Sequence, residues 1–203
     1  KKVKSSDILR RRGTSLNNMR LQEKYKKEVV PVLQKELNLS NVMEVPKIKK
    51  IIVNAGTGPF RENKEAVRVF SEELAALVGQ KPSERRARKS EAGFKIRQND
   101  VVGYAATLRG PRMWAFLDKL ISIVLPRVRD FRGLSRTSFD KEGNYSMGVT
   151  EHTIFPEVTQ NTTKGIRHLQ IVIVTDAGDK VKSEKLLSLI GLPFTKVEEK
   201  KNG

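Results

Sequence analysis

Apolar residues recur along this chain at two spacings, which predict helices and strands in alternation. Spacings of three and four are typical of one face of a helix, and period two is typical of a strand with one buried face. Helices are expected over 19–37, 63–78, 110–125 and 183–190, and strands over 46–55, 101–109, 145–149 and 167–175. Pro31 lies inside the first helical pattern and should kink or interrupt it.

This order of elements favours one α+β domain, in which a largely antiparallel sheet has helices packed on one face and its other face open. We expect that domain to span 19–194, after a basic, flexible arm over 1–18 and before a charged tail over 195–203.

Two of the expected strands leave their faces undecided. In 46–55 both faces are mixed, and Asn54 shares its face with Lys50. In 101–109 one face would carry Val102, Tyr104, Ala106 and Leu108, and the other Val101, Gly103, Ala105, Thr107 and Arg109. The second face is small in the middle and polar at its end, so it could pack against a helix or let a rigid partner approach the backbone. We favour the partner.

Charge narrows the kind of partner. The 203 residues carry a net charge of +17, and residues 1–99 hold 24 basic and 11 acidic side chains against 16 and 12 in the rest. Such an excess attracts a polyanion. The segment Ser83–Asn99 concentrates it, with Phe94 available to stack on a base. Its cations are Arg85, Arg86, Arg88, Lys89, Lys95 and Arg97. We predict that this segment is a basic, glycine-containing loop that binds RNA. We expect the open face of the sheet to bind RNA as well.

Catalytic and cofactor signatures are missing from the sequence. There is no cysteine, and His152 and His168 lack metal-binding spacing. The turn Gly56-Thr57-Gly58-Pro59 does not match a phosphate-binding loop, and no apolar run reaches membrane-spanning length. We therefore expect a non-enzymatic protein with no cofactor, no metal and no membrane contact. The rivals are an RNA-dependent enzyme and a nonspecific nucleic-acid binder.

Several long segments closely resemble the ribosomal protein L five family of the large subunit, in its bacterial-type form. They are Val42–Gly58, Gly79–Arg97, Thr107–Ser135, Ser138–Val149, Ile154–Val158 and Leu186–Phe194. They follow the family order from about Arg20 to Phe194.

The resemblance implies a structural protein that binds 5S rRNA in the central protuberance, together with large-subunit rRNA and neighbouring proteins. The matching rRNA-binding positions are Asn54, Gln80, Phe94, Thr107 and Arg109, and we expect Lys95 and Arg97 of the basic segment to bind rRNA as well. A basic loop should contact peptidyl-site tRNA through Arg85, Arg86, Arg88, Lys89 and Ser90. An intersubunit bridge to the thirteenth small-subunit protein is expected at Arg129, Arg132 and Arg136.

The resemblance also implies a cytoplasmic ribosome. The N-terminal arm and positions 60–65 depart from the family pattern, so a plastid or mitochondrial ribosome stays open as an alternative. The arm itself could be the remainder of a targeting region, although we favour an RNA-binding arm.

Overall fold

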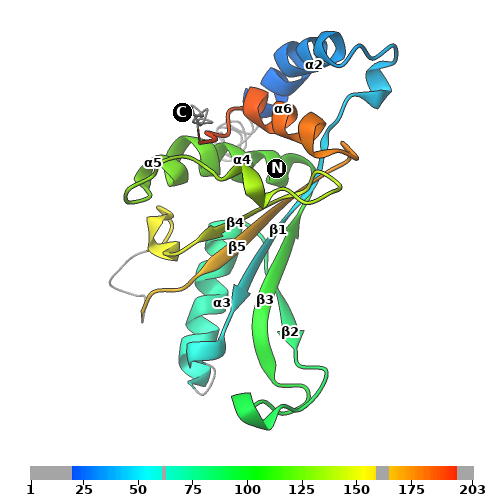
Figure 1. The fold of residues 1–203 in the computed structure, drawn as a ribbon. Helices are drawn as coiled ribbons and strands as arrows, with labels where there is room; N and C mark the ends of the chain where they lie inside the picture. Colours follow the sequence, from blue (N-terminus) through cyan, green and yellow to red (C-terminus); the bar gives the residue numbers. More distant parts are fainter. Residues whose placement is uncertain (1–19, 61–62, 159–164, 196–203) are drawn as a thin grey trace, which may run out of the picture. The chain divides into compact units, whose positions relative to one another are not determined.

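The computed structural model describes residues 20–60, 63–158 and 165–195 of the chain, so the predicted arm over 1–18 and all but Thr195 of the predicted tail lie outside it. One five-stranded sheet has the order β2-β3-β1-β5-β4 (Figure 1). Its strands are β1 (Ile48–Gly56), β2 (Ser83–Arg86), β3 (Val101–Leu108), β4 (Tyr145–Val149) and β5 (Leu169–Thr175). The pairs β1–β3 and β2–β3 are antiparallel. The predicted α+β class is confirmed.

The chain forms two compact units. One draws on the chain up to Ile48, on Pro111–Tyr145 and on the chain from Thr175 onward. The other consists of Lys49–Gly110 and Ser146–Val174, and it contains nearly all of the sheet.

Helix α3 (Lys64–Val78) covers one face of the sheet in the second unit. It begins where the Asn63 side chain accepts a hydrogen bond from the Ala66 amide at 3.0 Å, and it ends at Gly79, whose φ of 73° suits glycine. Its apolar stripe is buried, and the Phe70 ring meets the Tyr104 ring of β3 edge-on at 6.5 Å. The predicted helix over 63–78 therefore agrees with α3 apart from its N-cap residue, Asn63.

The first unit is mainly helical. Residues 20–36 form one helical run, in which a π-helical turn (η1, Tyr25–Val29) precedes α2 (Val30–Glu36), so the irregularity expected at Pro31 is present. The run Gly110–Arg127 has the same form, again with a proline, Pro126, after its π-helical turn. Its parts are α4 (Gly110–Lys119), η5 (Leu120–Val124) and α5 (Leu125–Arg127). The last helix is α6 (Lys180–Ile190), three residues longer at its start than predicted.

Short 3-10 turns connect these elements. They are η2 (Val42–Glu44), η3 (Gly58–Phe60), η4 (Ala92–Phe94), η6 (Arg136–Ser138) and η7 (His152–Ile154). None of the helices within the described ranges is both long and apolar enough to cross a membrane.

Two expectations about the hairpin β2–β3 were wrong. Ser83–Arg86 is not part of a loop but the edge strand β2, which the sequence could not indicate because all four residues are polar and exposed. In addition, the register shifts between Arg85, which pairs with Gly103, and Arg86, which pairs with Val101. This bulge reverses the predicted sides of Val101 and Val102, because an extra residue in one strand resets the alternation.

Candidate nucleic-acid interface

The pairing of β1 with β3 defines the two faces of the sheet. Ile51, Val53 and Ala55 pair with Leu108, Ala106 and Tyr104, and all six residues are buried. This is the face that α3 covers. We call the opposite side the open face. Asn54 lies there, paired with Ala105, and Ile52 lies there, paired with Thr107.

A shallow hollow of about 450 Å³ occupies the open face. It is lined by Ile52, Asn54, Ala55, Gly56, Arg85, Val102, Gly103, Ala105, Gln170 and Val172, from four neighbouring strands. Arg85 is the one charged residue in this lining. We call this site the open-face hollow. Its amides and single guanidinium can bind the polar edges and the phosphate of a nucleotide.

Three of the predicted rRNA-binding residues lie next to this hollow or in it. Asn54 lines it. Thr107 lies on the same face, where it pairs with Ile52, another residue of the lining. The Gln80 side-chain amide donates a hydrogen bond of 3.4 Å to the Thr107 carbonyl, which holds Gln80 against β3. Arg109 is exposed directly after β3.

The connection from β2 to β3 is an ordered, exposed loop (Ala87–Asp100), which we call the hairpin loop. The Ala87 amide bonds the Asp100 carbonyl at 2.9 Å and the Asn99 amide bonds the Ala87 carbonyl at 3.0 Å, which closes its base. Ser90 Oγ accepts a hydrogen bond of 2.9 Å from the Gln98 amide across the loop. At the far end Phe94 is 74% exposed. An exposed ring among cations is available for stacking on a base.

The structure therefore regroups the predicted site residues. Phe94, Lys95 and Arg97, predicted with the rRNA set, share the hairpin loop with residues of the tRNA set, namely Arg88, Lys89 and Ser90.

Two further residues predicted for the tRNA set, Arg85 and Arg86, lie outside that loop, on β2. Arg85 lines the open-face hollow, whereas Arg86 pairs with Glu84 at 2.8 Å on the other side of the strand. The sequence could not separate these adjacent arginines without knowing that β2 is a strand.

The three arginines predicted for the bridge differ in their surroundings. Arg129 and Arg132 are exposed. Arg136 instead forms an ion pair with Glu184 of α6, and its Nε donates to the Thr195 carbonyl at 3.1 Å. Arg136 thus ties together parts of the first unit.

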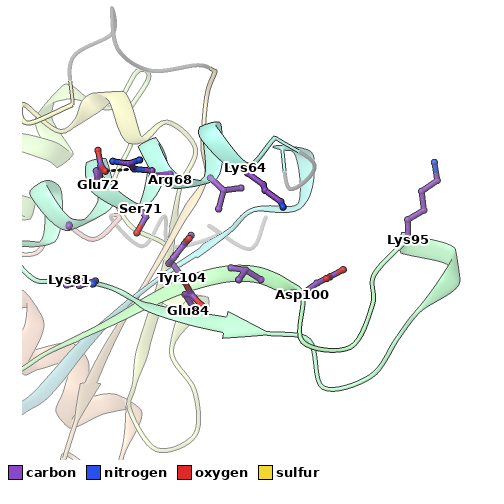
Figure 2. Close-up of a pocket in the computed structure, with 12 residues that line it drawn as sticks. Lys64, Arg68, Ser71, Glu72, Lys81, Glu84, Lys95, Asp100 and Tyr104 are labelled. Atoms are coloured by element: carbon purple, nitrogen blue, oxygen red, sulfur yellow. Dashed lines mark hydrogen bonds and ion pairs between the residues drawn. The ribbon is translucent and has the colours of Figure 1, made fainter.

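A second concavity lies on the covered side of the hairpin, between α3 and β2 (Figure 2). We call it the α3 groove. It measures about 940 Å³ and is lined by Lys64, Val67, Arg68, Ser71, Glu72, Ala75, Lys81, Glu84, Lys95, Asp100, Val101 and Tyr104. Arg68 and Glu72 form an exposed ion pair at 3.2 Å on α3. Burial, followed by the Glu84 carboxylate, raises the pKa of Tyr104 above its ordinary value.

Nothing in the described ranges assembles a metal centre: no group of three or more histidine, aspartate or glutamate side chains lies close enough to hold an ion. Two residues of the hollow were not expected there: Arg85, predicted for tRNA, and Gln170, for which the sequence predicted no role. The strand expected over 167–175 buries Leu169 and Ile171, so Gln170 between them lies on the opposite face.

An open sheet face beside an exposed basic loop is typical of RNA-binding proteins. Residues 41–97 match the family described as ribosomal protein L5, and residues 101–194 match the model of the C-terminus of the same ribosomal family. The chain is 51% identical over 175 residues to the large ribosomal subunit protein uL5 of Roseiflexus sp. (strain RS-1), covering 86% of this chain and 97% of the relative. It is 50% identical, with the same coverage, to uL5 of Rubrobacter xylanophilus.

The chain therefore belongs to the ribosomal protein L5 family. It is a structural protein and not an enzyme.

Proposed function

We propose that this chain binds 5S rRNA through its open sheet face and contacts peptidyl-site tRNA through its hairpin loop. Its family makes it a component of the large subunit of the cytoplasmic ribosome, with ribosomal RNA and ribosomal proteins as partners. The proposal adds which RNA each surface binds. It also includes the central protuberance as location and a bridge to the thirteenth small-subunit protein near Arg129 and Arg132.

One observation supports the first part most directly, which is the open face itself. Five strands present a surface on which Asn54, Ala105 and Thr107 are neighbours, with Arg109 at the end of β3. Small side chains there let a rigid helix or loop of RNA approach the backbone, and amides and hydroxyls can bond its sugars and base edges.

The hairpin loop supports the second part. It carries Arg88, Lys89, Lys95 and Arg97 around an exposed Phe94, and the hydrogen bonds at its base hold it in one arrangement. Cations at this density neutralise phosphates, and the ring offers a stacking surface.

The experiment is a salt titration of binding to folded 5S rRNA, with an unstructured RNA of the same length as competitor. We expect tight binding that survives excess competitor at physiological salt. The double variant R88A/K89A should keep that binding and reduce tRNA engagement in reassembled ribosomes. Binding of the wild type that the competitor abolishes would mean that bulk charge alone acts. Loss of 5S binding in the double variant would contradict the division into two surfaces.

A further inference from the structure

We infer that Arg85 is the phosphate ligand of a single-nucleotide site in the open-face hollow, and that the amides of Asn54 and Gln170 bind the base or ribose of the same nucleotide. This inference rests on the proposed binding of 5S rRNA to the open face. It assigns Arg85 to that RNA rather than to the tRNA-contacting loop.

The first step is the direction of the Arg85 side chain. β2 is the edge strand of the sheet, and its pairing with Gly103 places Arg85 over the open face. Its neighbour Arg86 lies on the other side, paired with Glu84. Adjacent side chains of a strand point to opposite faces, so β2 itself fixes this division.

The second step is the availability of the guanidinium. Within residues 20–60, 63–158 and 165–195, the Arg85 side chain forms no hydrogen bond or ion pair, although it is exposed beside a concavity. The lining of the hollow contains no carboxylate. A phosphate that enters would therefore meet one cation and no anion, and a guanidinium can bind two of its oxygens at once.

The rest of the lining supplies hydrogen-bonding amides and apolar surface. Asn54 on β1 and Gln170 on β5 are exposed and flank the hollow, and each amide can both donate and accept hydrogen bonds. Ile52, Val172 and Ala105 supply apolar surface for the face of a base. A volume of about 450 Å³ is within the range of small-ligand pockets, so one nucleotide of the bound RNA fits there.

The test compares R85A with R86A, two variants of equal net charge on adjacent residues of one strand. Both are assayed as full-length proteins against folded 5S rRNA across a range of salt concentrations, after circular dichroism confirms folding. Loss of one phosphate contact should lower the slope of log K against log salt by about 0.7 to 0.9 and the affinity by roughly tenfold in R85A. R86A should leave both quantities near those of the wild type. R85K should retain the slope but lose part of the affinity, because lysine is a point charge without the planar fork.

The variants N54A and Q170A remove hydrogen bonds to the nucleotide without changing the charge of the protein. Each should weaken binding several-fold without a change of slope. If the wild type binds 5S rRNA specifically but R85A and R86A behave alike, the nucleotide site is wrong and the proposed function stands. If the wild type shows no specific 5S binding, the proposed function itself fails.

Discussion

The open-face hollow and the α3 groove lie on opposite sides of one hairpin. They differ in whether carboxylates accompany their cations. The hollow has one charged residue, Arg85, and no carboxylate in its lining. The groove has four cations and three carboxylates. Some of the groove charges, such as Arg68 and Glu72, are already paired.

The difference shows that a net charge of +17 does not by itself locate an RNA site. A guanidinium with no carboxylate beside it gives its full attraction to a phosphate, whereas a cation beside carboxylates is partly compensated and screened by salt. The larger concavity is therefore the poorer candidate for RNA, and the smaller one, on the uncovered face, is the better candidate.

The largest expected effect concerns the close contact between β1 and β3 under the hollow. A Cβ on Gly103 would lie 2.7 Å from the Ala55 carbonyl oxygen, so Gly103→Val must push the two strands apart. We expect a loss of about 2–3 kcal/mol in the free energy of unfolding, measured by urea denaturation. The control is Gly56→Ala, at the residue that pairs with Gly103, where an added Cβ meets nothing within 4 Å. Equal stability of the two variants would show that the strands tolerate separation.

The next prediction tests whether RNA enters the open-face hollow. Gly56 lines the hollow, and a side chain added there meets no protein atom, so Gly56→Val should fold normally and obstruct the ligand. We expect at least a tenfold loss of 5S rRNA affinity, or about 1.4 kcal/mol. Gly148→Val on β4 is the matched control, because its Cβ also enters open space but outside the lining of the hollow. Unchanged affinity for Gly56→Val would remove the hollow from the interface.

These two faces also show which elements the sequence could predict and which it could not. Apolar patterns located α3, β1, β3 and β5, because each buries several apolar side chains. They could not locate β2, since Ser83–Arg86 buries no side chain and is a strand only through its pairing with β3. The same gap affected the site: composition placed Arg85 and Arg86 together, whereas the alternation of side chains along β2 separates them.

A buried histidine beside α3 should make the stability of the protein depend on pH. His152 is 1% exposed; its Nδ1 accepts from the Arg167 amide at 3.2 Å, and its Nε2 lies 3.4 Å from the Glu73 carboxylate. Burial lowers the pKa of His152, with Arg167 acting in the same direction and Glu73 opposing. A lowered pKa means that the unfolded chain binds the proton more readily, so this stabilisation is present above about pH 6.5 and is lost as pH falls through the folded-state pKa.

We therefore expect the urea midpoint of the wild type to fall between pH 7 and pH 5, with a slope of at most about 1.4 kcal/mol per pH unit from this group. His152→Asn, which keeps an acceptor near the Arg167 amide, should flatten that dependence. The exposed His168 supplies the control, since His168→Asn should leave the wild-type profile unchanged. A profile for His152→Asn as steep as the wild type would assign the pH dependence to other groups.

The smallest effect should come from the α3 groove. It tests whether a cation in that groove contributes to RNA binding. Arg68 is 82% exposed and paired with Glu72 four residues along α3, so Arg68→Ala should change the free energy of unfolding by no more than about 0.5 kcal/mol. It removes the same charge as R85A, yet its contribution to RNA binding should be only long-range and screened, less than about twofold at physiological salt. Filter binding to 5S rRNA, with both variants at matched ionic strength, measures this directly. If Arg68→Ala weakens binding as much as R85A does, affinity follows the number of cations rather than their position, and the distinction between the two concavities fails.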